Sequence, residues 1–412
     1  MVNPIGSIVP AALLSDFGQL TQKAIPPKEA PAETNPAAKF KYNHIYDVLI
    51  IPFRFEKFIL WSFLLHLNAL IYNLVILPLR VTLATSWLVW QNGCTLILLP
   101  TRKQRLKFKS KSYSYLTTRA QVDLARLVVA VVSSLVLYEL TNPSVIYHWI
   151  RSQGNFKLYL LKAVFEIADL LLKGIGRAVI ENLSREFQHK SEHWVGKFQA
   201  TFCLTFYLVL HSFVLTMEMF VVHVVLTMSG ESCFSFVFLN CFGELKISVF
   251  KKCDFAGLFQ YACNDAVERL QVGIYFLSTL AFTSQDLRSV ARRCAMMWLG
   301  ELITDYIKHF FLTRLNNINI EFYIGMRCNL FQRVKLLSLM SEQTQAGECT
   351  EEVKFKQYSQ QTGIEDKAMS HIEWDLLSPN VFDCESVLSM STNFMILPHV
   401  CLLLRNIQYF CA

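Results

Sequence analysis

Apolar residues in this chain gather in runs that are long enough to cross a membrane. The clearest run covers residues 198–217 and contains no charged side chain. A helix needs about 20 such residues to cross the hydrocarbon core of a bilayer, where it satisfies its own backbone polar groups. We therefore predict a membrane span here. The polar, lysine-rich block 244–260 that follows indicates a passage from the membrane to its surface.

Two uncharged runs near the start of the chain, 58–79 and 81–100, are separated by Arg80 alone. Since each run is just long enough to cross a bilayer, we predict two spans joined by a tight hairpin at 78–80. The alternative is one span together with a buried or interfacial helix.

Basic residues concentrate in the segment 101–126, which carries eight lysines and arginines and one acid. Positive residues beside spans favour the cytosolic side of a membrane, so we predict that this segment is cytosolic. A patch for anionic lipid is the alternative. The next apolar run, 127–150, is a further predicted span with Glu139 near one end. A charge within a span is costly and often functional, although Glu139 could simply extend to the membrane surface.

Charged residues recur every three or four positions between 150 and 187, which is the repeat of an α-helix. The other faces of this helix are apolar. We predict a helix at the membrane surface with a solvated charged stripe; the alternative is a helix that packs its stripe into a crevice between other helices. A second amphipathic pattern covers 294–315. The charged stripe of the first helix, between 150 and 187, consists of Lys162, Glu166, Asp169, Lys173, Arg177, Glu181 and Arg185.

Hydrophobic residues make up 53% of the chain and charged residues 17%, against about 25% charged residues in a soluble domain. This composition excludes a single soluble globule and predicts an integral membrane protein in contact with the lipid bilayer. The net charge of +7 fits topology and anionic headgroups, and we expect no nucleic acid as a partner. The twelve cysteines form no CxxC pair, so neither a disulfide framework nor a zinc finger is predicted.

These patterns together predict an all-α fold: a polytopic helical membrane protein with interfacial amphipathic helices. Residues 1–45, rich in proline and alanine, are predicted to be a disordered tail. A helical membrane domain is predicted over 46–339, a polar loop or tail over 340–392, and a short apolar segment over 393–412. The last segment holds too few apolar residues to span a membrane alone.

Few residue patterns in the chain point to catalysis. His189 and His193 belong to the HxxEH pattern of some zinc peptidases, with Glu192 between them. The pattern is short and lacks a third ligand, so we predict no zinc there and keep the peptidase as a remote alternative. Phosphate-binding loops, hydrolase elbows and dinucleotide fingerprints are absent from the sequence. We expect no enzyme activity, no catalytic, metal or cofactor-binding residues, and no small-molecule substrate.

Three polar residues lie within or beside the central apolar run: His211, Glu218 and His223. Seven positions separate His211 from Glu218, which places both on almost the same helix face. They could form an ion relay, as in a transporter or channel that also uses Glu139, or they could join helices by hydrogen bonds, which we favour. We predict that Glu218 is protonated or paired, with His211 as its partner.

The block 244–269 mixes acids and bases, so it is not a simple polybasic patch for lipid. We predict a cytosolic-interface element that holds helices or partners together. Its apolar pairs, Val249–Phe250 and Leu258–Phe259, are expected to be buried and to dominate its stability. Burying a phenylalanine is worth about 1.5–3 kcal/mol, whereas an exposed ion pair is worth at most about 1 kcal/mol. Asn182 heads a single permitted glycosylation sequon, a weak sign of a lumenal face.

Four stretches of the chain resemble a known family. They are a YHWIR stretch with the charges after it, the histidine of the central span, an ELK stretch with the lysines and aromatics after it, and the second amphipathic helix with its following asparagine. The residues that carry the resemblance include Arg151, Gln153, Asp169, His211, Glu244, Lys246, Phe250, Lys251, Phe259, Arg269, Asp305, Lys308, His309 and Asn316. They are similar to those of the transmembrane anterior posterior transformation proteins, a eukaryotic multi-pass membrane family, over residues 46–333.

The resemblance implies a multi-pass protein of the endoplasmic reticulum membrane without known catalytic activity. It also implies a scaffold or partner subunit in secretory-pathway protein homeostasis, in complex with a SUN-domain-like membrane glycoprotein, and in animals a link to ciliary and skeletal development. The chain departs from the family at Glu218, His223 and Ile247. It stops where the family continues into a last hydrophobic pair, so an incomplete C-terminal bundle is expected.

Overall fold

The computed structural model describes residues 44–98, 118–188, 194–283, 286–316 and 394–411, with a few further positions between 318 and 330. Across these residues the chain is helical and contains no strand. Two structural units are distinguished: residues 1–58 with 316–382, and residues 59–315 with 383–412. The second unit holds most of the described helices and the candidate site.

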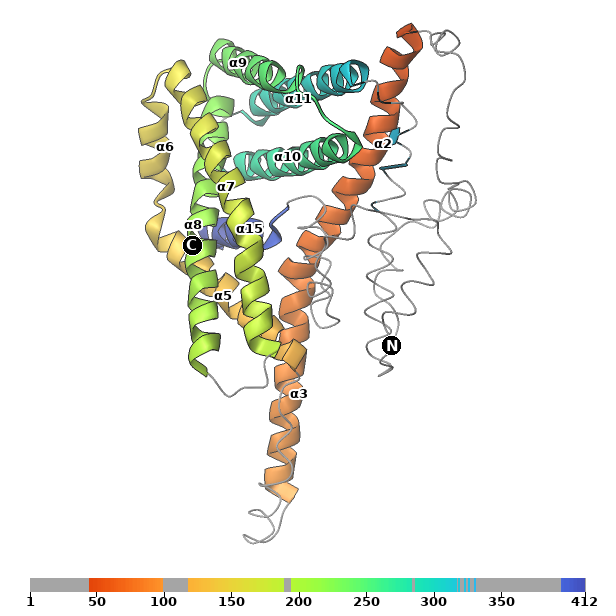
Figure 1. Cartoon of the computed structure of the whole chain (residues 1–412). Helices are drawn as coiled ribbons and strands as arrows, with labels where there is room; N and C mark the ends of the chain where they lie inside the picture. The colour runs from red at the N-terminus through yellow and green to blue at the C-terminus, as the bar shows by residue number, and fades with distance from the viewer. Residues whose placement is uncertain are drawn as a thin grey trace, which may run out of the picture. The chain divides into compact units, whose positions relative to one another are not determined.

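The described helices, labelled in Figure 1, are α2 (His44–Ile71), η3 (Tyr72–Ile76), α3 (Leu77–Leu98), α5 (Thr118–Leu140), α6 (Pro143–Arg151), α7 (Asn155–Gln188), α8 (Trp194–Thr227), α9 (Gly230–Ser248), α10 (Phe255–Phe282), α11 (Leu287–Leu315) and α15 (Ile396–Cys411). Within the second unit, α7 and α8 run side by side, and α9, α10 and α11 lie across their upper part in this view. α15 packs against α5 and α8.

The first two apolar runs form one continuous helix, so the predicted hairpin at 78–80 is wrong. α2, η3 and α3 follow one another without a break. Pro78 lacks the N–H that would bond back along the helix, and the wider π-helical turn of η3 directly before it accommodates this defect. Arg80 donates to the Tyr72 hydroxyl at 3.0 Å and lies 3.4 Å from Asp123 of α5. The charge between the two runs is thus paired within the protein and marks no turn.

Three described helices are long and apolar enough to cross a membrane, and α8 is the most buried of them. The candidate spans cover Ile50–Ser86, Gln121–Leu140 and Trp194–Thr227. In the most apolar part of the last, 83% of the residues are buried inside the protein, against 33% and 39% in the other two. The predicted all-α membrane fold is confirmed, and the span predicted at 198–217 lies within α8.

The run 127–150, predicted as one span, is divided between two helices. α5 ends at Leu140, and α6 begins at Pro143. Proline disfavours the helical conformation in the residue before it but suits the first turn of a new helix. Asn142 caps α6, because its side chain accepts a hydrogen bond of 3.1 Å from a backbone N–H two residues on.

α7 is inside out compared with a surface helix of a soluble protein. Part of its charged stripe faces neighbouring helices: Lys162 and Asp169 are buried, whereas Arg185 near the end of the helix is exposed. Its apolar side chains point outward instead, with Leu171 66% and Ile167 60% exposed. The prediction of a solvated stripe is therefore wrong for these buried charges, and the alternative of a stripe packed between helices is correct. An apolar outer face suits contact with lipid.

Two glycines allow close approaches between helices. A Cβ atom at Gly300 of α11 would lie 2.7 Å from Val237 Cγ1 of α9, and a Cβ at Gly176 of α7 would collide with the Tyr207 hydroxyl of α8. Small residues let helices in membranes approach closely enough for dispersion contacts and hydrogen bonds. These crossings bring the polar side chains of the four helices within reach of their neighbours.

The C-terminal helix α15 belongs to the core of the second unit. Arg405 is fully buried, and its Nε donates to Thr141 Oγ1 at 2.9 Å. The guanidinium lies 5.2 Å from the centre of the Phe220 ring. On α8, Ser212 donates to the Pro398 carbonyl at 3.2 Å. A segment too short to cross a membrane alone is therefore held by buried polar contacts.

Four predictions concern residues that lie wholly or mostly outside the described part of the chain. They are the tail 1–45, of which 1–43 lie outside, the basic segment 101–126, of which 101–117 lie outside, His189 with His193, and the polar segment 340–392. The cytosolic placement of the basic segment and the expected lack of zinc stay predictions.

Candidate functional site

Ionisable side chains from three consecutive helices meet inside the second unit. On α10 and on α11 they follow one another at helical spacing, so each helix presents its set on one face. One acid joins from the C-terminal half of α9. This group, here called the charged cluster, consists of Glu244 of α9, Asp265, Glu268 and Arg269 of α10, and Glu301, Asp305, Lys308 and His309 of α11.

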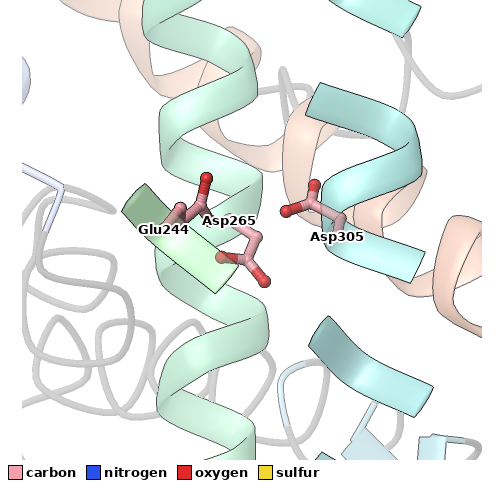
Figure 2. A group of neighbouring side chains, drawn as sticks. All are labelled: Glu244, Asp265 and Asp305. Atoms are coloured by element: carbon pink, nitrogen blue, oxygen red, sulfur yellow. The ribbon is translucent and has the colours of Figure 1, made fainter. Parts of the chain in front are cut away.

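Lys308 lies at the centre of the charged cluster. Its Nζ is 2.5 Å from Glu244 Oε1, 2.7 Å from Asp265 Oδ1 and 3.0 Å from Asp305 Oδ1. Figure 2 shows these three carboxyl groups, with Asp305 reaching from α11 toward the other two. Lys308 is only 3% exposed, so its ammonium group binds these carboxylates instead of water. One side chain thus ties α9, α10 and α11 together.

Arg269 and His309 complete the pairing of the two aspartates. Arg269 Nε donates to Asp305 Oδ2 at 2.9 Å, and His309 Nε2 lies 2.7 Å from Asp265 Oδ2. Burial alone would raise the pKa of Asp265, but Lys308 and His309 lower it to about 2. Burial would likewise lower the pKa of Lys308, but the surrounding carboxylates raise it well above its ordinary value. Asp265 and Lys308 are therefore charged at neutral pH.

The opposite side of the charged cluster has fewer cationic partners. Glu301 Oε1 accepts from Asn240 Nδ2 at 3.2 Å, and Asn240 Oδ1 accepts from Lys162 Nζ at 3.0 Å. Lys162 also pairs with Glu166 on α7. Burial raises the pKa of Glu301 to about 7 against the opposing effect of Lys162. Burial and the neighbouring acids raise the pKa of Glu268 well above its ordinary value.

The charged cluster contains more acids than bases. Its five carboxyl groups face three side chains that are cationic at neutral pH, Lys162, Arg269 and Lys308. A cavity of about 10 Å³, the room of roughly one water molecule, lies beside Glu268 and Glu301. A buried unpaired charge is costly, so the surplus favours carboxyl groups that keep a proton.

Carboxylates this close together could hold a metal ion. Oxygens of Glu244, Asp265 and Asp305 lie within 4.8 Å of one another, and so do those of Glu244, Glu268 and Glu301. An all-oxygen group suits a hard divalent cation. In the first group, however, the central lysine ammonium already takes the place that such a cation would fill. Sequence reasoning, which predicted no metal ligands, did not foresee this grouping.

A second buried group, here called the polar network, joins α7, α8, α10 and α15. Asp169 Oδ1 lies 2.7 Å from His211 Nε2, and His211 Nδ1 lies 2.7 Å from the Tyr207 hydroxyl. Lys173 Nζ is 2.6 Å from Asp169 Oδ2. Burial would raise the pKa of Asp169, but His211 and Lys173 hold it well below its ordinary range. The polar network consists of Asp169, Lys173, Tyr207, His211, Gln271 and His399.

Gln271 extends the polar network from α7 to α15. Its Nε2 lies 3.5 Å from Asp169 Oδ2 and 3.2 Å from His399 Nε2. The other ring nitrogen of His399 lies 2.7 Å from the Met395 carbonyl oxygen. Burial lowers the pKa of His399 to about 3, so this ring is neutral at physiological pH. Asp169 is the single carboxylate of the network.

The predicted pairing of His211 with Glu218 is wrong. His211 binds Asp169, whereas Glu218 accepts a hydrogen bond of 3.1 Å from the Tyr275 hydroxyl of α10. Spacing along α8 placed the two side chains near one face, but each meets a different neighbouring helix. Glu139 is exposed at the end of α5. Of the residues named for the transporter alternative, Glu139 therefore lies at the surface, whereas His211 and Glu218 are buried with different hydrogen-bond partners.

The apolar pairs of the block 244–269 are only half buried. Val249 and Leu258 are buried. Phe259 is half-buried, and Phe250 is 82% exposed, so the predicted burial of both pairs is wrong. The reason is local: Phe250 follows the end of α9, where the chain turns away from the helix.

The remaining motif residues lie outside both buried groups. Arg151 is exposed at the end of α6, and Gln153 donates to a backbone carbonyl of the same turn at 3.2 Å. Lys246 and Lys251 are exposed at and just after the end of α9. Asn316 is half-buried and falls in the other structural unit.

Sequence reasoning missed several partners of these groups. Each is an uncharged or weakly basic polar residue within an apolar stretch. That isolation is the signal that could have found them, because a polar group buried among apolar helices needs a hydrogen-bond partner. The missed residues are Tyr207, Asn240, Gln271, Tyr275 and His399.

The all-helical fold, the three candidate spans and the ionic contacts buried between helices define a helical integral membrane protein. Its polar side chains hold helices together across long sequence distances. A sequence model of a protein family, described as "Eukaryotic membrane protein family", matches residues 116–412. The chain belongs to this family, and the resemblance to the transmembrane anterior posterior transformation proteins is confirmed.

Curated relatives come from distant eukaryotes. Endoplasmic reticulum membrane protein 65 of Schizosaccharomyces pombe is 28% identical over 315 residues, which is 71% of this chain and 47% of the relative. The transmembrane anterior posterior transformation protein 1 homolog of Homo sapiens is 27% identical over 299 residues, 70% of this chain and 50% of the relative. The chain spans about half the length of these relatives. No solved structure matches it.

Proposed function

We propose that the protein is a non-enzymatic scaffold or partner subunit of the endoplasmic reticulum membrane that serves protein homeostasis in the secretory pathway. The observation that supports this proposal is the use of the buried ionisable residues. In the charged cluster and the polar network they bind one another across helices, and the cavity beside Glu268 and Glu301 has room for about one water molecule. Such contacts specify how helices pack and offer little space to a substrate.

The location and the partner rest on similarity. A relative that shares 28% identity over 71% of this chain is named endoplasmic reticulum membrane protein 65, which supports placement in the same membrane. The family resemblance points to a SUN-domain-like membrane glycoprotein as the partner, and to ciliary and skeletal development as the process affected in animals. Apolar side chains exposed on α7 and α11, such as Leu171 and Leu299, are available to lipid or to a partner helix.

The proposal is tested by purifying the tagged full chain, expressed at its native level, after mild detergent extraction. We expect it to fractionate with endoplasmic reticulum markers and to recover a membrane glycoprotein in near-equal molar amount by quantitative mass spectrometry. Chemical cross-linking in intact membranes before extraction controls for association after lysis. A chain that stays monomeric under cross-linking, or that resides in another membrane, contradicts the proposal.

A second candidate function, movement of protons or cations, is favoured by one observation. The five carboxyl groups of the charged cluster face three permanent cations, Arg269 and Lys308 of the cluster and Lys162 of α7, and burial raises the pKa of Glu301 to about 7. A buried carboxyl group that titrates near neutral pH is a common element of proton relays. The full chain in proteoliposomes that contain a pH-sensitive dye tests this function. Proton flux above that of empty vesicles, lost in Glu301→Gln and kept in Glu139→Gln, supports it; flux equal to empty vesicles excludes it.

A further inference from the structure

In the segment 244–255 the lysines are exposed at the surface, whereas one of the two acids is directed into the protein. Glu244 points inward, where it pairs with Lys308 of the charged cluster. Lys246, Lys251 and Lys252 are exposed. One acid, Asp254, also stays at the surface, where its side chain caps α10 by accepting a hydrogen bond of 2.8 Å from a backbone N–H. A stretch that is mixed in sequence is therefore mainly basic on its surface.

Aromatic side chains line the outer face of α9 up to this basic surface. Phe234, Phe238 and Phe242 follow one another at steps of four, are each more than half exposed, and stack as neighbours with ring centroids 6.5 Å and 6.4 Å apart. The next step of four is Lys246, in the last turn of α9, and the exposed Phe250 follows the end of the helix. The outer face of α9 therefore presents a continuous apolar row that ends in basic residues.

The connection from α9 to α10 adds further apolar side chains to the same surface. Ile247 and Phe255 are exposed, together with the 82%-exposed Phe250. Lys251 lies 5.2 Å from the centre of the Tyr261 ring of α10, which holds this lysine beside the connection. This surface, here called the α9 corner, consists of Lys246, Ile247, Phe250, Lys251, Lys252 and Phe255.

The position of α9 places the α9 corner near a membrane boundary. The candidate span α8 ends at Thr227, and α9 begins three residues later, capped by Ser229. From there α9 runs across the α7–α8 pair instead of continuing along it (Figure 1). A helix that turns across the end of a span stays near the level at which the span leaves the hydrocarbon core.

We propose that the α9 corner binds the surface of an anionic bilayer. The exposed Ile247, Phe250 and Phe255 insert among the acyl chains, and Lys246 and Lys252 contact the negatively charged headgroups. Large apolar side chains beside lysines are the usual composition of an interfacial anchor, since the lysine stems extend along the apolar surface while their ammonium groups stay in water. Each lysine near such a surface favours the bound state about five-fold.

Hydrogen exchange of the intact full chain in lipid nanodiscs tests the proposal. One preparation contains phosphatidylcholine alone, and the other also contains about 30% phosphatidylserine to supply negative surface charge. The connection 249–254 lies outside the helices. The Val249 and Lys251 amides donate to backbone carbonyls at 3.1 Å and 3.2 Å, and we expect the other amides of the connection to exchange rapidly unless lipid covers them. We expect slower exchange of peptides from 246–255 in the anionic nanodiscs, and loss of this difference in high salt.

The variant Lys246→Gln with Lys252→Gln should lose the lipid-dependent difference while the amides of α8 keep their protection. The matched control is Arg185→Gln, which removes an exposed cation from the last turn of α7 and should leave the difference in exchange between the two nanodiscs unchanged. Equal exchange in both nanodiscs overturns the proposal, as does a difference that survives the double lysine change. Protection that appears only when a second protein is added would assign the surface to a protein partner and also overturn it.

Discussion

The charged cluster and the polar network are both buried between helices, but they differ in how their charges are balanced. In the polar network the single carboxylate of Asp169 meets Lys173 and His211, which hold its pKa well below the ordinary range. In the charged cluster five carboxyl groups meet three permanent cations, and burial raises the pKa of Glu301 to about 7.

The difference shows two ways of keeping ionisable groups inside a helical membrane protein. The first is to pair each charge with a partner of opposite sign. Such a pair stabilises the fold at every pH above the lowered pKa of its acid. The second is retaining protons on surplus acids, which makes stability depend on pH near neutrality. Substitutions that alter one group and leave the other intact test this contrast.

The largest effect is expected from Lys308→Met. This change leaves three carboxylates without their shared cation, and breaking a buried ion pair costs about 3–5 kcal/mol. The free energy of unfolding of the purified chain in mixed micelles, followed by circular dichroism, measures the loss. Lys246→Met removes an exposed lysine of α9 and should change the free energy of unfolding by less than about 0.5 kcal/mol. Equal effects of the two changes would contradict the central place given to Lys308.

The second-largest expected effect is the change of the unfolding free energy with pH that Glu301 causes. The pKa of Glu301 is about 7 in the folded protein against an ordinary 4.5, so between these values the folded state binds a proton that the unfolded state has released. Stability should therefore fall as pH rises through this window, by on the order of 3 kcal/mol. The charged and titratable groups around Glu301 are Lys162, Glu244, Glu268, Asp305 and Lys308.

Glu301→Gln isolates this dependence, because the amide keeps the shape of the side chain and cannot titrate. The unfolding free energies of the variant and the unmodified chain should converge near pH 4.5 and diverge toward pH 7, the range between the two pKa values, with the variant more stable at the upper end. Titrating groups far from the charged cluster affect both proteins alike, whereas the pKa of Glu268 is also lower in the variant because the Glu301 charge that raises it is gone. Parallel curves would show that Glu301 holds no extra proton.

A smaller effect is expected from Asp169→Asn in the polar network. The change leaves Lys173 and His211 without their carboxylate, and a broken buried hydrogen bond of this kind costs about 1–3 kcal/mol. Because the pKa of Asp169 is lowered in the folded protein, its contribution is complete at neutral pH and is lost only in acid. A double-mutant cycle with His211→Leu should give a coupling of about 0.5–3 kcal/mol; additive losses would contradict the pairing.

The smallest effect is expected from Phe250→Ala. This side chain is 82% exposed, so its truncation in micelles should change the unfolding free energy by less than about 0.5 kcal/mol. Leu258→Ala, ten positions from the end of α9, is the contrasting change, because Leu258 is fully buried and its truncation should cost about 2–5 kcal/mol. A large loss in Phe250→Ala would mean that residue 250 packs inside the protein.

The fold class of the protein and much of its local structure could be predicted from the sequence. The uncharged run 198–217 predicted the span within α8, because its length matches the hydrocarbon core. The repeat of three or four positions predicted the helix α7 and its charged stripe. The motif residues also included members of both buried groups, among them Asp169, His211 and Lys308.

Other features were decided by the tertiary structure alone. Asp169 and His211 are 42 positions apart, and Asp265 and Lys308 are 43 apart, so no local pattern relates them. Helical periodicity determines which side chains share a face, but the partner opposite depends on how distant helices cross. For the same reason the stripe of α7 turned inward and Phe250 outward: composition specifies what needs burial, and only the packed helices determine which surface is available to bury it.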